Sequence, residues 1–343
     1  MQVKGVELTH RNFIAVTANY FYQRLEKSSP SVGLSTVPLF HVFGFHYLLK
    51  SVALGETVVV MGRFDLGKML RAVEEHKVTL LAVAPPVVAG MVKSDLTRKF
   101  DLQSLEAVGS GAAPLGLDLR IEAFKKKFPK VSLYQGYGMT ETSGALSRPV
   151  GDDEYARLSS VGKLIGTIEA KIVDLDTGVG LPQGKLGELW IRGPTVMKGY
   201  VDNHKANSET LVGDGWLRTG DICYIDDEGF LFVIDRVKEL IKYKGYQVSP
   251  AELEELLLSH PDIMDAAVIP YPDEDAGQVP LAFVVCRPKS NLDEQQIIDF
   301  IGKQVSPYKK VRRVAFISSI PKSASGKILR KELLKNSLPR SKI

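Results

Sequence analysis

Residues 31–135 alternate between short runs of β-branched and aliphatic residues and longer segments with helical periodicity. The predicted strands are Val32–Thr36, Thr57–Met61, Val78–Ala84, Leu105–Gly109 and Val131–Tyr134. The predicted helices between them are Leu66–Glu75, Pro86–Lys93 and Leu117–Phe128. This alternation is typical of βαβ units, in which helices cover a mostly parallel sheet. It places the chain in the α/β class.

The region after Glu141 has the pattern of an antiparallel structure. Its predicted strands are separated by turns rich in glycine and proline, and they are Ala170–Asp174, Glu188–Arg192, Ile222–Ile225 and Leu231–Ile234. Residues Asp226–Gly229 close the last two strands into a hairpin. We therefore expect a small antiparallel β-barrel or sheet here.

The last third of the chain predicts a smaller α+β unit. Two short strands open it, Ile241–Lys242 and Tyr246–Val248, with a turn at Gly245. A helix follows, with Ser249 as its N-cap and Glu252 completing a capping box. The remaining elements are strands Ala266–Ile269 and Leu281–Cys286, a helix from Asp293 and strand Val314–Ile317.

These patterns predict two domains. Residues 1–235 form part of a large α/β domain, which combines the parallel sheet, its helices and the small antiparallel β-barrel. Residues 238–343 form a small α+β domain of about 105 residues, long enough to hold a core of its own.

The composition excludes several classes of protein. With 44% hydrophobic and 24% charged residues among 343, the chain is neither disordered nor collagen-like nor a coiled coil. Its richest apolar stretch, Val78–Val92, contains Pro85-Pro86 and is shorter than the ~20 residues of a membrane-spanning helix. Cys223 and Cys286 form no CxxC pair, so neither a disulfide framework nor a zinc site is indicated. A net charge of +4 is too balanced to indicate nucleic-acid binding.

Two segments directly follow predicted parallel strands, where open α/β sheets bind their ligands. They are Gly109–Pro114 and Tyr134–Glu141. In the second, Thr140 offers a hydroxyl to a phosphate oxygen, and Glu141 offers the carboxylate that magnesium takes together with substrate phosphates. Taken singly, each segment could also be an ordinary surface turn.

Three further segments carry charge. Asp221 follows Gly220 and suits the hydroxyls of a ribose, and residues Arg236–Lys244 place four basic side chains between the two predicted domains. The segment Pro321–Lys327 looks like a P-loop at first sight. It has proline where that loop requires its first glycine and Ile328 where it requires Ser or Thr, so the chain is not a P-loop NTPase.

Taken in order, these segments resemble the adenylate-forming superfamily, and most closely the plant 4-coumarate–CoA ligase-like proteins. The resemblance extends from Lys4-Gly5 to Ser325–Lys327. It implies an acid–thiol ligase, which forms an acyl-adenylate from a carboxylic acid and Mg²⁺-bound ATP and then an acyl-CoA thioester. ATP, Mg²⁺ and coenzyme A are the implied cofactors, and phenylpropanoid or fatty acid metabolism is the implied context.

The resemblance also assigns roles by motif. The nucleotide-binding residues would be Ala112, Gln135, Gly136, Thr140, Asp221, Arg236 and Lys327. The catalytic residues would be Thr140, Glu141, which would bind magnesium, and Lys327, which would stabilise charge in the transition state. The acyl-adenylate would be contacted by His41, Phe43, Lys238, which also matches the family's hinge, and Lys242. The coenzyme A path would be lined by Arg63, Lys244 and Gly245.

Phe43 indicates which kind of carboxylic acid the chain would take as its substrate. Coumarate ligases carry a tyrosine at this position, whose hydroxyl helps to hold the phenol. The apolar Phe43 and Phe45 favour an aliphatic or aromatic-aliphatic acid over a hydroxycinnamate.

The beginning of the chain departs from the family. Members have an upstream region of roughly one domain, including a phosphate loop of which only Lys4-Gly5 is present here. Thr9 is the expected N-cap of a helix over Asn12–Leu25, so the chain begins in mid-element. We expect a truncated chain, with exposed apolar surface, poor solubility and little adenylation on its own.

The last three residues, Ser341–Ile343, differ from the peroxisomal Ser-Lys-Leu signal only in the final residue. They predict recognition by a peroxisomal import receptor, with the cytoplasm as the alternative location. Two other functions stay open. One is an adenylate-forming enzyme with an acceptor other than coenzyme A, and the other is a truncated, non-catalytic relative.

Overall fold

The structure is a computed structural model that describes residues 4–24, 31–115, 118–157, 159–288, 290–323 and 327–337. The chain divides into two compact units. The first unit consists of Met1–Thr219 and Cys223–Val233, and the second consists of Gly220–Ile222 and Ile234–Ile343.

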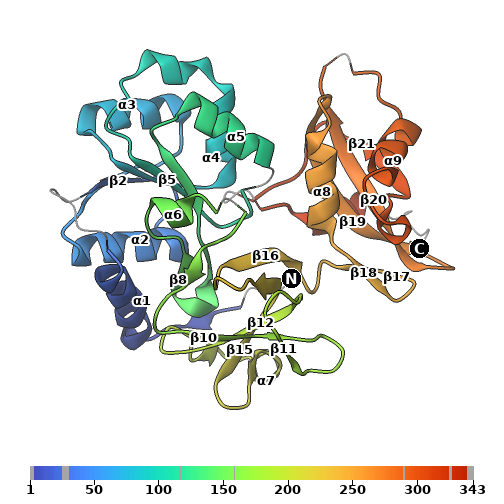
Figure 1. Cartoon of the computed structure of the whole chain (residues 1–343), viewed down its shortest axis with the longest axis horizontal. Helices are drawn as coiled ribbons and strands as arrows, with labels where there is room; N and C mark the ends of the chain where they lie inside the picture. Colours follow the sequence, from blue (N-terminus) through green and yellow to red (C-terminus); the bar gives the residue numbers. More distant parts are fainter. Residues whose placement is uncertain are drawn as a thin grey trace. The chain divides into compact units, whose positions relative to one another are not determined.

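A five-stranded parallel sheet forms the centre of the first unit (Figure 1). Its strands, in spatial order, are β3 (Thr57–Val60), β2 (Val32–Ser35), β4 (Leu80–Val83), β5 (Ala107–Ser110) and β6 (Ser132–Gln135). Every neighbouring pair is parallel. The strands predicted from the sequence are confirmed, with small shifts at their ends.

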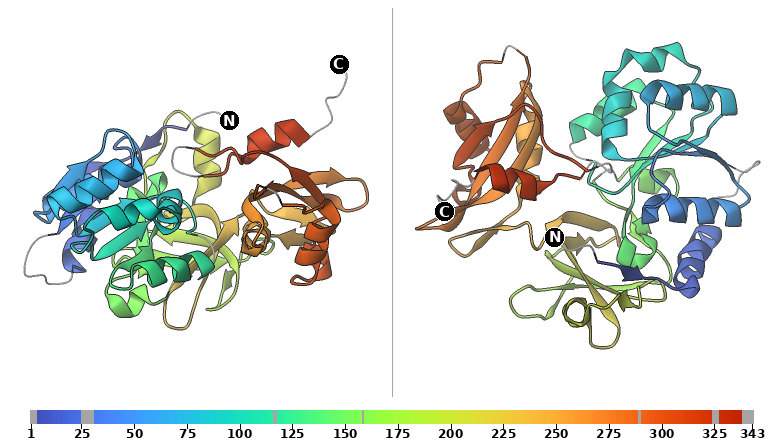
Figure 2. Two further views of the ribbon diagram at one scale, coloured as in Figure 1. Left: turned by 90° about the horizontal axis from the view of Figure 1, so that it is seen from above. Right: turned by 180° about the vertical axis from the view of Figure 1, so that it is seen from behind.

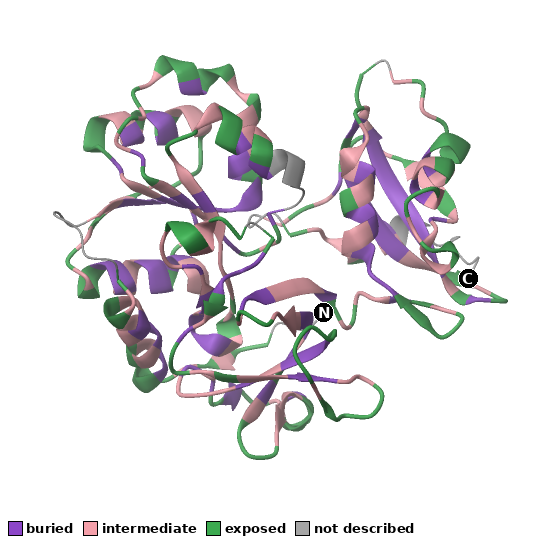
Figure 3. Ribbon diagram, viewed as in Figure 1, coloured by how far each residue is buried: buried purple, intermediate pink, exposed green. Residues whose placement is uncertain are grey.

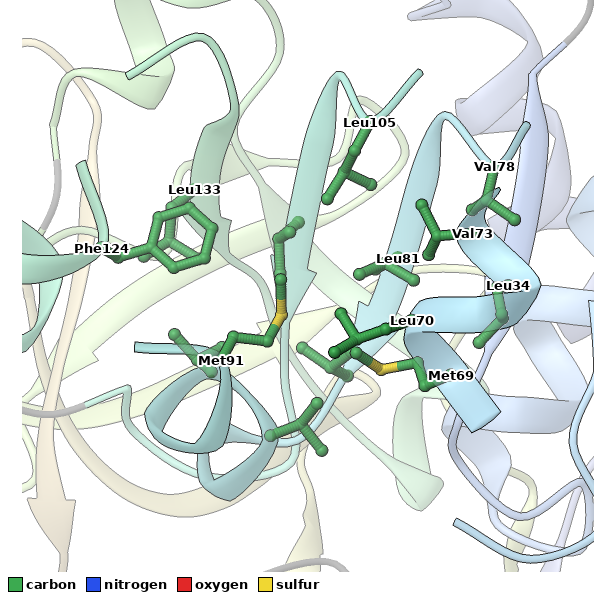
Figure 4. Close-up of a cluster of buried hydrophobic side chains, with 14 of the residues drawn as sticks. Leu34, Met69, Leu70, Val73, Val78, Leu81, Met91, Leu105, Phe124 and Leu133 are labelled. Carbon is green, nitrogen blue, oxygen red and sulfur yellow. The ribbon is translucent and has the colours of Figure 1, made fainter. Parts of the chain in front are cut away.

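The three predicted helices are present, and they cover one face of this sheet. They are α3 (Leu66–His76), α4 (Pro85–Lys93) and α5 (Asp118–Lys127). Their apolar side chains meet those of the strands in the largest core cluster, where Met69, Met91 and Phe124 pack with Leu81 and Leu133 (Figure 4). Each of these side chains is at most 2% exposed, so the cluster fixes the sheet on which the candidate site is built.

The opposite face of the sheet carries a helix that the sequence did not predict, α2 (Val42–Ala53). A Cβ atom on Gly33 of β2 would lie 2.1 Å from the hydroxyl of Tyr47, so a residue without a side chain lets α2 approach the strand. The predicted helix with Thr9 as N-cap is present as α1 (His10–Tyr22) and contacts α2. It ends before Leu25, which lies outside the described residues.

Antiparallel sheets follow, as expected, and all of their residues belong to the first unit except Gly220–Ile222 of β15 and Ile234–Arg236 of β16. The largest has the order β11 (Gly180–Leu181), β10 (Glu169–Val173), β12 (Gly187–Arg192), β15 (Trp216–Ile225) and β14 (Leu211–Val212), with β16 (Leu231–Arg236) on β15. A three-stranded sheet consists of β7 (Tyr137–Met139), β8 (Gly144–Arg148) and β9 (Lys163–Leu164). The pair β1 (Val6–Glu7) and β13 (Gly199–Tyr200) is separate. Short helices are η1 (Asp95–Lys99), η2 (Thr140–Thr142), α6 (Asp152–Tyr155) and α7 (His204–Thr210).

The second unit is built on a mixed sheet. Its strand order is β18 (Tyr246–Val248), β17 (Ile241–Tyr243), β20 (Gly277–Cys286) and β19 (Ile263–Asp273), and β21 (Arg313–Phe316) pairs with β20 in parallel. The helices are α8 (Pro250–Ser259), α9 (Glu294–Gly302), α10 (Arg330–Ser337) and the short η3 (Pro307–Lys309). In the left view of Figure 2 the strands lie between α10, in red, and the helices α8 and α9.

Alternating side chains of β19 serve both faces of that sheet. Ala266 and Val268 belong to the core under α8 and α9, whereas Ala267 and Ile269 belong to the core under α10. The buried residues accordingly run along β19 and β20 in Figure 3. Because β19 ends the sheet, it is an edge strand.

One local prediction in this unit is wrong. Ser249 is the N-cap of α8 and accepts the backbone N–H of Glu252, but Glu252 does not complete a capping box. Both of its carboxylate oxygens instead accept hydrogen bonds from Lys309 at 2.8 Å. A partner distant in sequence therefore replaces the local one.

Large apolar side chains of α1 and α2 are exposed to solvent. Tyr22 is 83%, Val52 72% and Ile14 68% exposed. Over the residues that the structure covers, no helix is both long and apolar enough to cross a membrane.

Candidate active site

The parallel sheet brings four predicted residues to one edge. Phe43 lies beyond the end of β2, Ala112 beyond the end of β5, and Gln135 and Gly136 at the end of β6. Carboxyl ends of parallel strands share an edge, and ligands of open α/β sheets bind there.

Direct contacts join these strand ends. A Cβ atom on Gly111, next to Ala112, would lie 3.2 Å from the Phe43 ring, so the ring packs against bare backbone. Gln135 Oε1 accepts the backbone N–H of Leu115 at 3.2 Å, and Gly136 donates its N–H to Ser110 at 3.0 Å. The loop after β5 is thus held beside the end of β6.

The backbone at this edge is under strain or tightly packed at two positions. Ala112 is exposed and has a φ of 73°, in the left-handed region that residues with a Cβ atom seldom adopt. Such outliers cost roughly 1–3 kcal/mol and cluster at ligand sites. Gly138 permits a close approach, because a Cβ atom there would lie 2.0 Å from the carbonyl oxygen of Gly144.

Thr140 and Glu141 follow in the short helix η2, where Thr140 is exposed. The Glu141 side chain is fixed by Tyr200, whose hydroxyl donates to Oε1 at 2.7 Å. The Glu141 carbonyl accepts the N–H of Met197 at 2.9 Å, and Lys4 Nζ lies 4.4 Å from the centre of the Tyr200 ring. Glu141 is therefore held in place before any ligand binds.

The single carboxylate of Glu141 suits a magnesium ion whose other ligands are phosphate oxygens and water. Within the described ranges, no three or more His, Cys, Asp or Glu side chains are grouped so that they could hold a metal ion. A single carboxylate such as Glu141 fits an ion that takes its other ligands from elsewhere.

His41 caps helix α2. Its Nδ1 accepts the backbone N–H of Phe43 at 3.2 Å, and burial lowers the pKa of the imidazole. A ring that accepts at Nδ1 carries its proton on Nε2, so His41 offers a neutral donor. Arg63 is exposed beyond the end of β3, at the opposite side of the sheet from β6, so the structure does not bring it to Gln135.

In the second unit, three predicted residues come together. The Asp221 carboxylate, 5% exposed, lies 3.2 Å from the Arg236 guanidinium. Lys327 lies within electrostatic reach of both. Lys327 is exposed to solvent, yet partial desolvation and the Arg236 cation lower the pKa of its ammonium, although Glu239 and Asp221 act in the opposite direction.

The other predicted cations of this unit lie at turns. Lys238 is exposed in the turn Arg236–Leu240, which is closed by the Glu239 N–H donating to the Arg236 carbonyl at 2.9 Å. Lys242 is exposed on β17. Lys244 and Gly245, with φ of 46° and 83°, form the two-residue loop between β17 and β18, as in a type I′ hairpin.

Four charged or polar residues near these sites were not predicted from the sequence. They are Tyr200, which holds Glu141, and the ion-paired Glu239, Glu254 and Arg330. Tyr200 lies 59 positions from Glu141, and Arg330 lies 76 positions from Glu254, so no local pattern relates the partners. Burial raises the pKa of Glu254 to about 7.

Comparison with known proteins identifies the family. The AMP-binding enzyme family matches residues 2–201, and the AMP-binding enzyme C-terminal domain matches residues 252–327. The chain belongs to the AMP-binding enzyme family. It is 57% identical to 4-coumarate--CoA ligase-like 9 of Arabidopsis thaliana over 97% of its own length and 60% of that protein's. It thus spans about three fifths of that relative.

Solved structures of this AMP-binding family have the same fold. The amide bond synthetase McbA from Marinactinospora thermotolerans gives a TM-score of 0.88 at 29% identity, over 98% of this chain and 68% of that one. o-Succinylbenzoate CoA synthetase (MenE) from Bacillus subtilis, in complex with its acyl-adenylate OSB-AMP, gives 0.84 at 30% identity, over 99% and 67%. The same enzyme has been solved with ATP and a magnesium ion.

Proposed function

We propose that this AMP-binding enzyme is, in its whole form, an acid–thiol ligase. A carboxylate oxygen of the acid attacks the α-phosphorus of ATP and pyrophosphate leaves, which gives an acyl-adenylate. The thiol sulfur of coenzyme A then attacks the acyl carbon, and AMP leaves. The observation that carries this proposal is the grouping of Asp221, Arg236 and Lys327 in one unit of an AMP-binding fold.

The proposed roles follow from the chemistry of each group. Asp221 is a buried acceptor for ribose hydroxyls, and Arg236 fixes it by an ion pair. Lys327 supplies a cation where negative charge develops between carboxylate and phosphate. Thr140 and the backbone around Gly136 face the nucleotide, and Glu141 holds magnesium, which neutralises phosphate charge when bound.

Phe43 supports an aliphatic or aromatic-aliphatic acid as the substrate. Its ring packs on the backbone of Gly111 at the sheet edge and offers no hydroxyl to a phenol. We expect acids of C8–C18 to be activated faster than 4-coumarate. Faster turnover of 4-coumarate than of every C8–C18 acid would reject this substrate class.

Because the chain spans about 60% of its relative, the assay uses the endogenous protein beside the 343-residue chain. An antibody against residues 252–327 recovers the endogenous protein, and its intact mass is measured first. Acid-dependent pyrophosphate release is then measured with a panel of acids. The absence of release by the endogenous protein with every acid would reject the adenylation proposal.

Substitution of Lys327 tests the proposed chemistry directly. We expect Lys327→Ala to lower the adenylation rate by at least about 100-fold, the scale of losing one charge-stabilising group. Lys185→Ala is the matched control, because Lys185 is an exposed lysine in a turn of the first unit. Equal rates for the two variants would remove Lys327 from the reaction.

A second candidate function differs in the molecule that accepts the acyl group, since McbA is named an amide bond synthetase. An exposed lysine at the tip of the β17–β18 hairpin favours coenzyme A, because Lys244 can meet its phosphates. We expect Lys244→Ala to lower thioester formation while ATP–pyrophosphate exchange continues. If both rates stay unchanged and an amine replaces coenzyme A as acceptor, the chain is an amide-forming relative.

We further propose import into the peroxisome through Ser341–Ile343, which lie outside the described residues. A fluorescent protein carrying only the last ten residues of the chain should then give a punctate signal. A diffuse signal would reject import and favour the cytoplasm.

A further inference from the structure

Residues 321–323 and 327–329 form the two arms of a hairpin; backbone hydrogen bonds join the arms, and the second arm bears Lys327. Ser323 donates its N–H to the Lys327 carbonyl at 2.8 Å, and Leu329 donates to Pro321 at 2.9 Å. On the first arm, Lys322 pairs with Asp265 of β19 at 2.6 Å. On the second arm, the residue that follows the hairpin and begins α10 is Arg330.

Arg330 joins three elements of the second unit. Its Nη1 and Nη2 approach the two carboxylate oxygens of Glu254 on α8 at 3.0 and 3.1 Å, the fork geometry of a strong arginine–carboxylate pair. Its Nε lies 3.0 Å from Oε2 of Glu239, in the turn Arg236–Leu240. The two groups form an ion pair, but Nε donates no hydrogen bond. The Arg330 side chain is only 14% exposed, so water screens these pairs weakly.

Without those partners, the position of Arg330 would lower the stability of the folded unit. A cation at the first residue of a helix faces the positive end of the helix dipole, which disfavours it. A buried guanidinium also loses its hydration. Two carboxylates offset both penalties, and Glu254 is itself fixed because its Oε1 accepts the N–H of Val268 on the edge strand β19 at 2.8 Å.

We propose that Arg330 is a positioning residue, which holds the hairpin bearing Lys327 against helix α8 and the turn Arg236–Leu240. The proposal rests on the role of Lys327 in the proposed function and adds a residue to it. Arg330 lies three positions after Lys327, so a displaced α10 N-terminus would displace the lysine. Its tie to Glu239 couples Lys327 to the turn that also carries Arg236 and Lys238.

Lys327 itself provides a readout that does not need the enzymatic reaction. The charged groups that face it are Arg236, Glu239, Asp221 and Arg330, and its pKa is lowered in this environment. Glu254 is not among them, since it faces Arg330, Asp235 and the Val268 N–H. Arg330 is the one group named here that contacts Glu254 directly and also faces Lys327.

The experiment is pulse acetylation of the full 343-residue chain with acetic anhydride between pH 7 and 11, with modification of Lys327 read by peptide mass spectrometry. The variants are Arg330→Met, Arg330→Lys and Glu254→Gln, and the amide oxygen of the last would keep an acceptor for the Val268 N–H. Arg313→Met is the control, because Arg313 is an exposed arginine of the same unit that stacks on Tyr271. Protection of β20 amides from hydrogen exchange establishes that each variant is folded.

We expect the pH midpoint of Lys327 acetylation to rise in Arg330→Met and in Glu254→Gln, by about half a unit, roughly threefold in the protonation ratio. The Lys327 midpoint in Arg330→Lys should lie between the midpoint of these two variants and that of the wild type, because one ammonium cannot bridge both carboxylates. A folded Glu254→Gln with the wild-type midpoint would overturn the proposal. So would an Arg330→Lys variant identical to wild type, since charge alone would then suffice.

Activity separates this proposal from the function on which it rests. If the wild-type protein adenylates an acid, Arg330→Met should lower kcat by about 10- to 100-fold with little change in KM for ATP, as expected for a misplaced catalytic group. An unchanged kcat in that variant would contradict positioning while leaving adenylation intact. If no acid is adenylated and the midpoints still shift, the ion-pair network stands and the proposed function fails.

Discussion

The two units hold their candidate residues in different ways. In the first unit, Gln135, Gly136 and Glu141 are placed by strand ends, backbone hydrogen bonds and one tyrosine hydroxyl. In the second, Asp221 and Lys327 are placed among ion pairs that join distant segments. The first arrangement should tolerate changes of pH and salt but not added atoms, and the second should behave in the opposite way.

The largest effect is expected from removing Arg330. Arg330→Met leaves Glu254, a side chain only 11% exposed, without its partner, and breaking such a buried pair costs about 3–5 kcal/mol. The measurement is the free energy of opening of β20, from hydrogen exchange in the second unit. Adding Glu254→Gln to the same chain should recover part of the loss. A single variant as stable as wild type would mean that charge pairing does not hold this unit.

The next effect is a dependence of the second unit on pH. The folded pKa of Glu254 is raised to about 7 from an ordinary 4.5, so the folded unit binds a proton that the unfolded chain releases. Stability from this group is therefore greatest below about pH 4.5 and is lost as the pH rises through 7, by up to about 3 kcal/mol.

Glu254→Gln should remove this slope, whereas Glu274→Gln, at an exposed glutamate, should keep it. Opening free energies of β20 amides between pH 5 and 8, corrected for intrinsic exchange, provide the comparison. Parallel slopes in all three proteins would show that Glu254 does not titrate in this range.

A steric change should affect the first unit by a somewhat smaller amount. In Gly138→Ala the new methyl group would meet the Gly144 carbonyl 2.0 Å away, and the strands β7 and β8 must separate. Overpacking of this kind costs roughly 1–3 kcal/mol. The fluorescence of Trp190 and Trp216, both in this unit, follows its unfolding in urea. Gly62→Ala, where a Cβ atom meets nothing within 4 Å, should be nearly neutral.

The smallest effect is expected at Tyr200. Tyr200→Phe removes the hydrogen bond to Glu141 and should cost about 1 kcal/mol, the scale of an ordinary hydrogen bond, because water can reach this carboxylate. Magnesium-dependent ATP binding, measured by calorimetry, should weaken several-fold because Glu141 is no longer held. Unchanged binding would indicate that Glu141 needs no support.

The parallel sheet was predictable because each of its elements has its own local pattern. Strands such as β2 and helices such as α3 show the periods of strand and helix directly. Helix α2 was missed because it follows an apolar run and its cap is a histidine, His41, rather than Ser, Thr, Asp or Asn. A helix that is apolar on most sides has no polar face to reveal its period.

The candidate site was predictable only where a motif is contiguous. Thr140, Glu141 and Lys327 lie in motifs with a fixed order, and their roles remain predictions. Arg330 lies near Lys327 in the sequence, but its ion-pair partners, Glu254 and Glu239, are far from it in the sequence. The role of such a residue depends on which charged side chains the fold brings to it, and these pairs cannot be read from the pattern of a single sequence.

The carboxylate of Glu254 has a further consequence. Strand β19 ends its sheet, and an unpaired edge strand can recruit a strand from another molecule and start aggregation. Glu254 occupies the Val268 N–H at that edge, and Lys322 pairs with Asp265 farther along the same strand. We therefore expect that loss of the Glu254 carboxylate would also make this edge more open to a strand from a second chain.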